Sequence, residues 1–165
     1  MEVSPSGERG ATIRLDDQEA AMMRDLADQL RDIVKGDDAS DPVVGRFYPP
    51  AHEVPEEDRK YRDLVGSELK NGKARALESV QLSLGDSGPV TVSLGEDEID
   101  PWLTTLTDMR LAIGTRMDVT EEKMNEQLDP NDPDAAPLSV LHWLGWIQQS
   151  LIEASSGIVP PEEAR

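Results

Sequence analysis

Cysteine is absent from the sequence, and histidine occurs only at His52 and His142 among 165 residues. A chain without a thiol forms no disulfide, no thiolate nucleophile and no cysteine-ligated zinc or iron–sulfur centre. Two histidines are also too few for a histidine-rich metal site. We therefore expect no metal and no other cofactor. The lack of cysteine also fits a reducing compartment, so the sequence predicts a cytoplasmic protein.

Long apolar runs are missing as well. No stretch approaches the roughly 20 apolar residues needed to cross a bilayer, and the first ten residues lack the apolar run of a signal peptide. The sequence thus predicts no membrane association. We expect a disordered tail over residues 1–11, a single domain over 12–155 and a C-terminal tail over 156–165.

Basic residues are few beside the acidic ones. Lys and Arg number 16 against 34 Asp and Glu, which gives a formal net charge of −18. Nucleic-acid affinity comes largely from Lys and Arg that displace the counterions of phosphate groups. This charge therefore argues against direct binding of nucleic acid. It favours association with basic partners, such as proteins that themselves bind nucleic acids.

Apolar residues at helical spacing dominate the chain. They predict helices over about 17–35, 96–117 and 137–154, with one short helical turn around 121–127. They also predict a helix from about 56 to 84, which either breaks at Gly72 or continues as one long helix. Alternating β-branched residues predict two short strands, 12–15 and 90–94, and the prolines between 37 and 55 predict a loop. The expected fold class is mainly α, a single domain of four to five helices, with a small two-stranded β element as an optional addition.

Each predicted strand leads into an acidic helix start. Residues 12–19 (Thr-Ile-Arg-Leu-Asp-Asp-Gln-Glu) and 91–98 (Thr-Val-Ser-Leu-Gly-Glu-Asp-Glu) share this layout. We favour the interpretation that strand-to-helix junctions generally look like this. The alternative is that the two halves pair their strands into one ribbon, which is stable only when helices cover one face.

A basic stripe is the strongest chemical feature of the sequence. Arg59, Arg62, Lys70 and Lys73 fall within about 80° of one another if they share one helix. Such a patch suits a carboxylate-rich partner or a phosphate group. The alternative, which we favour, is a solvated helix face that balances acidic residues on the adjacent helix.

Trp146 and His142 form a second candidate site for a protein partner. They lie one turn apart and roughly opposite the apolar positions Leu144, Ile147 and Leu151 of the same predicted helix. An outward-facing tryptophan in a chain with 4% aromatic residues is a candidate hot spot. The alternative is a helix buried on all sides, which we favour. We assign no catalytic role to His142.

Two arginines, Arg110 and Arg116, lie in the predicted helix over 96–117. Arg110 is at the edge of its apolar stripe, and a partly buried arginine needs a carboxylate or backbone carbonyls as partners. We expect both arginines to form structural ion pairs, with an anion site as the alternative. The sequence has no phosphate-binding glycine loop, dinucleotide fingerprint or nucleophile elbow. We therefore predict that the protein is not an enzyme.

Several stretches of the sequence resemble one known family. They are 108–116, 128–135 and 140–151, supported by 12–30 and 47–51, and the most specific blocks are Gly114-Thr115-Arg116 and Leu144-Gly145-Trp146. The sequence resembles the actinobacterial domain-of-unknown-function family whose best-described members are oxidative-stress regulators. The resemblance implies a cytoplasmic regulator that acts through a stress sigma factor and RNA polymerase rather than by catalysis. Those regulators are thought to sense oxidant through cysteines. Because this chain has none, the resemblance implies regulation by protein binding alone.

The sequence therefore predicts a non-enzymatic regulatory protein that binds a sigma factor or an RNA polymerase subunit. Two other functions remain open. One is an adaptor or accessory protein in regulated proteolysis. The other is a carboxylate-based enzyme, which requires two or more acids that converge in a pocket.

Overall fold

The computed structural model describes residues 1–36, 38, 40–49, 55–61, 65–125 and 129–157. Within these ranges the chain forms three strands and seven helices: β1 (Glu2–Ser6), β2 (Gly10–Leu15), α1 (Asp17–Lys35), α2 (Pro42–Phe47), α3 (Pro55–Tyr61), α4 (Ser67–Leu84), β3 (Val90–Leu94), α5 (Glu96–Arg116), α6 (Glu121–Asn125) and α7 (Ala135–Ser155). The mainly α fold class is confirmed. The helix count exceeds the expected four to five because short helices interrupt the connecting segments.

Local sequence fixes the starts of the two helices that follow strands. At α1 the Asp16 side chain accepts hydrogen bonds from the backbone N–H groups of Gln18 and Glu19, both at 2.9 Å. At α5 the Glu98 carboxylate accepts from the backbone N–H of Gly95 at 2.8 Å. Both contacts satisfy N–H groups that a helix terminus leaves without an internal partner. The helices expected over 17–35, 96–117 and 137–154 are thus confirmed within one or two residues.

The sheet has three antiparallel strands in the order β1-β2-β3. Thr12 of β2 lies opposite Ser93 of β3, so the two strands with similar sequences do pair. The expectation of a two-stranded element was wrong by one strand. The expectation of a disordered tail over 1–11 was wrong as well, because β1 pairs with β2 along its whole length, from Glu2 opposite Arg14 to Ser6 opposite Gly10.

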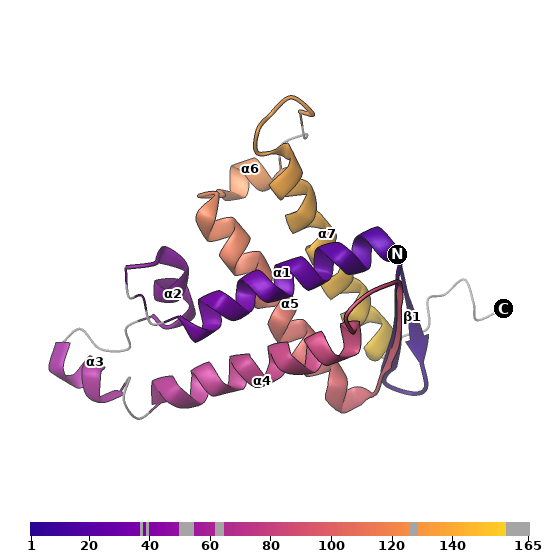
Figure 1. The fold of residues 1–165 in the computed structure, drawn as a ribbon, viewed down its shortest axis with the longest axis horizontal. Helices are drawn as coiled ribbons and strands as arrows, with labels where there is room; N and C mark the ends of the chain where they lie inside the picture. Colours follow the sequence, from indigo (N-terminus) through magenta and orange to yellow (C-terminus); the bar gives the residue numbers. More distant parts are fainter. Residues whose placement is uncertain (37, 39, 50–54, 62–64, 126–128, 158–165) are drawn as a thin grey trace.

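Packing explains why the N-terminal residues are ordered. In Figure 1, β1 lies beside α7 at the end of the molecule where the N-terminus is found. A strand at the edge of a sheet gains stability when a helix covers one of its faces. Pro5 fits this position, since an edge strand leaves one side of its backbone unpaired and proline has no N–H to donate. The C-terminal tail expected over 156–165 lies outside the described residues from 158 onward.

The segment between α1 and α4 departs most from the prediction. The expected loop over 37–55 contains α2, whose Val43 and Phe47 are buried. The expected helix over 56–84 is represented by α3 and α4, and α4 continues through Gly72 without a break. In Figure 1, α3 stands apart from the other helices, and none of its residues is buried. Tyr61 of α3 and Leu69 of α4 are exposed although both are large and largely apolar.

Four long helices enclose the core. Figure 1 shows α1 and α4 side by side, with α5 and α7 crossing behind α1. The largest fully buried side chains come from these four helices, from β2 and from α2: Trp102, Ile13, Met23, Leu106, Met109, Leu144, Ile147, Leu151, Val34, Val43, Val80 and Thr105. Within the described ranges, no helix combines the length and the hydropathy that a membrane span requires.

Candidate protein-binding surface

Helix α7 has a buried face and an exposed face. Leu144, Ile147 and Leu151 are completely buried, whereas Trp146 is 50% exposed and Ile152 is 46% exposed. The expectation of a helix buried on all sides was therefore wrong. The alternation arises because residues three and four apart share a helix face, and Trp146 lies on the opposite side from the three buried residues.

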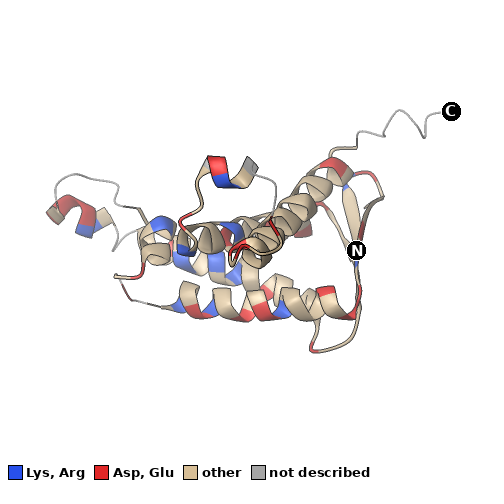
Figure 2. Cartoon of the chain, turned by 90° about the horizontal axis from the view of Figure 1, so that it is seen from above, with Lys and Arg blue, Asp and Glu red and all other residues tan. Residues whose placement is uncertain are grey.

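The exposed face of α7 borders a groove of about 410 Å³, which we call the α7 groove. α5 contributes Arg110 and α6 contributes Met124, and the remaining lining residues come from α7: Leu141, His142, Gly145, Trp146, Gln148, Gln149 and Ile152. None of these is Asp or Glu, although the chain has 34 of them. In Figure 2 the helix that leads to the C-terminus is tan along most of its length. The α7 groove thus combines polar and apolar side chains, without a carboxylate among the lining residues named, on a strongly acidic molecule.

Arg110 is positioned by a hydrogen-bonded chain between α5 and α7. Its Nη1 donates to Oε1 of Gln148 at 2.8 Å, and Nε2 of Gln148 donates to Oγ1 of Thr107 at 2.6 Å. The guanidinium lies over Gly145, where an added Cβ would come within 3.5 Å of it. A residue without a side chain at this position leaves room for the guanidinium close to the α7 backbone.

The expected ion pair of Arg110 is not formed within the part of the chain that the structure describes. Its hydrogen-bond partner there is the neutral amide of Gln148, and its Nε is buried without a hydrogen-bond partner. Arg110 was correctly expected to be partly buried. The pattern of apolar residues could not show, however, that its partner on α7 is the amide of Gln148. Sequence analysis also did not single out Gln148 or Met124 as residues of this site.

Arg116 forms the ion pair that was expected of it. Its Nη2 lies 3.1 Å from Oδ2 of Asp41, and Oδ1 of Asp41 accepts from the backbone N–H of Val43 at 2.9 Å. The same carboxylate therefore caps α2 and ties that short helix to the C-terminal end of α5. This contact is structural and lies outside the α7 groove.

The basic stripe does not form one surface. Arg59 is on α3, whereas Lys70 and Lys73 are on α4, and Arg62 lies outside the described residues. Lys73 is largely buried, with its Nζ 2.6 Å from Oδ1 of Asp108 on α5. This geometry agrees with the alternative that the stripe balances acids on the adjacent helix, and it corrects the expectation that Lys73 is available to a partner.

The Lys73–Asp108 pair lies in an apolar setting. Asp108 is only 4% exposed, and Lys73 Nζ also lies 4.9 Å from the centre of the Phe47 ring. Burial raises the pKa of Asp108 above its usual value, although the hydrogen bond and the charge of Lys73 oppose the shift. Burial and the nearby Asp108 charge also raise the pKa of Tyr48. The pair links α4 to α5 beneath α2, and its burial makes it a structural contact.

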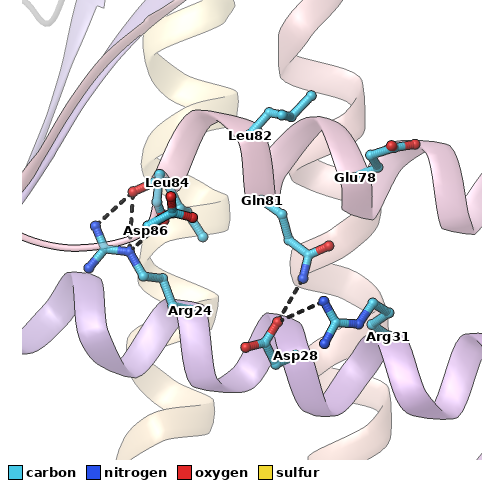
Figure 3. A pocket seen from close by; sticks show the side chains of 9 residues that line it. Arg24, Asp28, Arg31, Glu78, Gln81, Leu82, Leu84 and Asp86 are labelled. Carbon is cyan, nitrogen blue, oxygen red and sulfur yellow. Dashed lines mark hydrogen bonds and ion pairs between the residues drawn. The ribbon is translucent and has the colours of Figure 1, made fainter.

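A second groove, of about 540 Å³, lies between α1 and α4 and is shown in Figure 3. At one end, the Arg24 guanidinium donates to the backbone carbonyls of Leu84, Gly85 and Gly88 at 2.7 to 2.8 Å. These carbonyls lie at or just beyond the end of α4, where a helix leaves acceptors without internal partners. Arg24 therefore stabilises the C-terminus of α4.

The other end of this groove is bridged by the side chains of its own walls. Gln81 of α4 donates to Oδ1 of Asp28 at 2.9 Å, and Arg31 of α1 lies 3.2 Å from the same oxygen. Figure 3 shows the Gln81–Asp28 contact running from α4 to α1, whereas Arg31 and Asp28 both lie on α1. Because Arg24, Arg31 and Gln81 already have partners, the α1–α4 groove is a weaker candidate than the α7 groove. Across the described ranges, no group of three or more His, Asp or Glu side chains is arranged to hold a metal ion.

The described residues thus form a helical domain whose best candidate site is an exposed groove suited to protein contact. Residues 2–155 match the family described as a domain of unknown function, DUF2017, and the chain belongs to that family. Similar curated proteins are the oxidative stress regulator AosR of Mycobacterium tuberculosis and that of Mycobacterium bovis. Each is 26% identical over 153 residues, which covers 84% of this chain and 70% of the relative. No solved structure matches the chain.

Proposed function

We propose that this protein is a non-enzymatic cytoplasmic regulator of transcription under oxidative stress, and that it acts by binding a sigma factor or a subunit of RNA polymerase. The name of the relatives, oxidative stress regulator, supports the regulatory part of the proposal. The observation that carries the binding part is Trp146, which is 50% exposed and lines the α7 groove.

Surface chemistry supports a protein as the ligand of the α7 groove. Tryptophan is enriched among the residues that contribute most to protein–protein binding, and at protein interfaces its large apolar ring is buried while its N–H finds a partner. Ile152, two turns along α7, continues the apolar surface. The net charge of −18 supports a partner whose overall charge is positive, because opposite charges accelerate association.

The proposed protein regulates without a thiol switch of its own. A cysteine pair converts oxidant into a structural change by forming a disulfide, and this chain contains no cysteine. Binding therefore does not depend on the oxidation state of a thiol in this protein. Any oxidant signal reaches it through its partner or through its own abundance.

The test is binding of purified sigma factors and core RNA polymerase from the same organism, measured by biolayer interferometry. We expect Trp146→Ala to weaken binding at least about tenfold, the effect of losing a hot spot. Leu82→Ala is the matched control, because Leu82 is 79% exposed on α4 and outside the α7 groove. Absence of binding, or equal loss in both variants, would contradict the proposal. Trp146-dependent binding of a protease chaperone instead would favour the adaptor function.

A further inference from the structure

The charge distribution around the α7 groove differs from that of the rest of the molecule. Acidic residues outnumber basic ones by more than two to one in the chain, yet among the described residues that line the groove Arg110 is the one with a formal charge. The carboxylate of α7, Glu153, lies at the end of the groove, where its Oε1 accepts a hydrogen bond from Gln149 at 2.8 Å. A ligand in this groove therefore meets the positive charge of Arg110 in an otherwise weakly charged wall.

Arg110 carries an incompletely satisfied charge into this wall. Its guanidinium has five N–H donors, and one hydrogen bond, to Gln148, is formed within the described residues. Two arginines that are held in the structure have stronger partners, since Arg116 pairs with a carboxylate and Arg24 donates to several carbonyls. The planar guanidinium of an arginine can donate two parallel hydrogen bonds to one carboxylate, and a carboxylate is therefore the protein group that it binds best.

Apolar side chains line the same groove as this arginine. They are Trp146 and Ile152 of α7, and the Arg110 guanidinium lies over Gly145 of the same helix. A ligand that places a carboxylate on Arg110 therefore brings its neighbouring groups against an aromatic ring and an aliphatic side chain. This combination fits a peptide in which an acidic residue alternates with apolar ones.

We propose that the α7 groove binds a short acidic–apolar segment of a partner protein, with a carboxylate on Arg110 and apolar side chains against Trp146 and Ile152. This inference rests on the proposed function only in taking the groove as the partner site. Long-range repulsion from the −18 charge disfavours polyacidic ligands. The segment consequently carries one or two carboxylates, whatever the overall charge of the protein that contains it.

The test uses a phage-displayed library of random 12-residue peptides, selected on the purified full-length protein. We expect enriched peptides to share an Asp or Glu next to aliphatic or aromatic residues. Synthetic copies should bind Arg110→Gln and Trp146→Ala at least about tenfold more weakly than the wild-type protein, and should bind the Leu82→Ala control normally. Replacing the shared Glu of a peptide with Gln should cause a similar loss against the wild-type protein, which keeps the test valid if Arg110→Gln does not fold.

Several results would overturn the inference. They are failure to enrich any peptide, enrichment of basic peptides, binding that survives both groove substitutions, and binding that survives the Glu to Gln change in the peptide. Self-association that Trp146→Ala abolishes would show that a second copy occupies the groove, which also overturns it. Because the library contains no transcription protein, acidic–apolar peptides that bind here would support this inference even if sigma factors and RNA polymerase did not bind.

Discussion

The buried pair of Lys73 and Asp108 allows a quantitative prediction for Lys73→Met. Removal of one partner of a buried ion pair typically costs about 3–5 kcal/mol, because the other charge is left without compensation. Asp108, at 4% exposure, has little access to water. Its carboxylate then escapes the penalty only by taking up a proton.

Protonation sets an upper limit to this cost and makes it depend on pH. A carboxyl group with an unfolded pKa of about 3.9 requires about 4 kcal/mol to stay protonated at pH 7, and about 1.5 kcal/mol at pH 5. Burial already raises the pKa of Asp108 in the folded protein. The folded state therefore binds the proton of Asp108 more tightly than the unfolded state does. The contribution of Asp108 to the free energy of unfolding consequently falls as the pH rises through its pKa in the folded protein. We expect Lys73→Met to lower the free energy of unfolding by about 3–4 kcal/mol at pH 7 and by about half of that or less at pH 5.

Urea unfolding followed by circular dichroism at both pH values measures this difference. The double variant Lys73→Met/Asp108→Asn should recover much of the loss at pH 7, because no unpaired charge remains in the core. Lys60→Met is the matched control, since Lys60 and Glu56 form an exposed pair with atoms 3.9 Å apart. A loss for Lys73→Met that is independent of pH, or equal to that of the double variant, would refute the reasoning.

Three further predictions concern the stability of the fold. Gly10→Ala should lower the free energy of unfolding, measured by thermal unfolding, by more than about 2 kcal/mol, because the new Cβ would collide with the carbonyl oxygens of Ser6 and Leu94, the latter at 2.6 Å. Gly72→Ala should instead stabilise α4 by about 0.5–1 kcal/mol, because the space around its Cβ is open. Arg24→Gln should cost about 1–3 kcal/mol in urea unfolding, because it removes hydrogen bonds to the carbonyls at the end of α4. No change in stability for Gly10→Ala or for Arg24→Gln would contradict these contacts.

The long helices were predictable because strong local signals agree with their tertiary environment. The Asp16–Glu19 pair marks the start of α1, and its apolar positions recur at helical spacing. The same agreement holds for α5 and α7. β1 was missed although β2 follows it after a short turn, because the helix that covers β1, α7, is distant in sequence and its packing is revealed only by the tertiary structure. Helix α2 was missed because prolines around it suggest a loop, although Pro42 occupies the first turn, where proline is tolerated.

The candidate site was only partly predictable for a related reason. Helical periodicity placed His142 and Trp146 on one face of α7, opposite its apolar positions. Periodicity could not establish whether another helix covers that face, so the exposure of Trp146 required the tertiary structure. Nor could it show that Arg110 of α5 reaches Gln148 of α7, because the two are 38 positions apart. Lys73 was misplaced on an open surface because its buried partner, Asp108, lies on a different helix.

The two sequence blocks that carry most of the family resemblance meet in the structure. The block over 108–116 lies in α5 and the block over 140–151 lies in α7, and the two helices pack against each other. Gly145, within the second block, receives the guanidinium of Arg110 from the first. Their association explains how residues distant in sequence form one groove beside Trp146.

Contact between the α7 groove and a transcription protein inside the cell is the central claim, and site-specific photocrosslinking measures it directly. The photoreactive residue p-benzoylphenylalanine replaces Trp146 in one variant and Leu82 in the other, and both are irradiated in cells under oxidative stress. Mass spectrometry should identify a sigma factor or an RNA polymerase subunit among products from position 146 and not from position 82. Identical products from both positions, or none from position 146, would contradict the account.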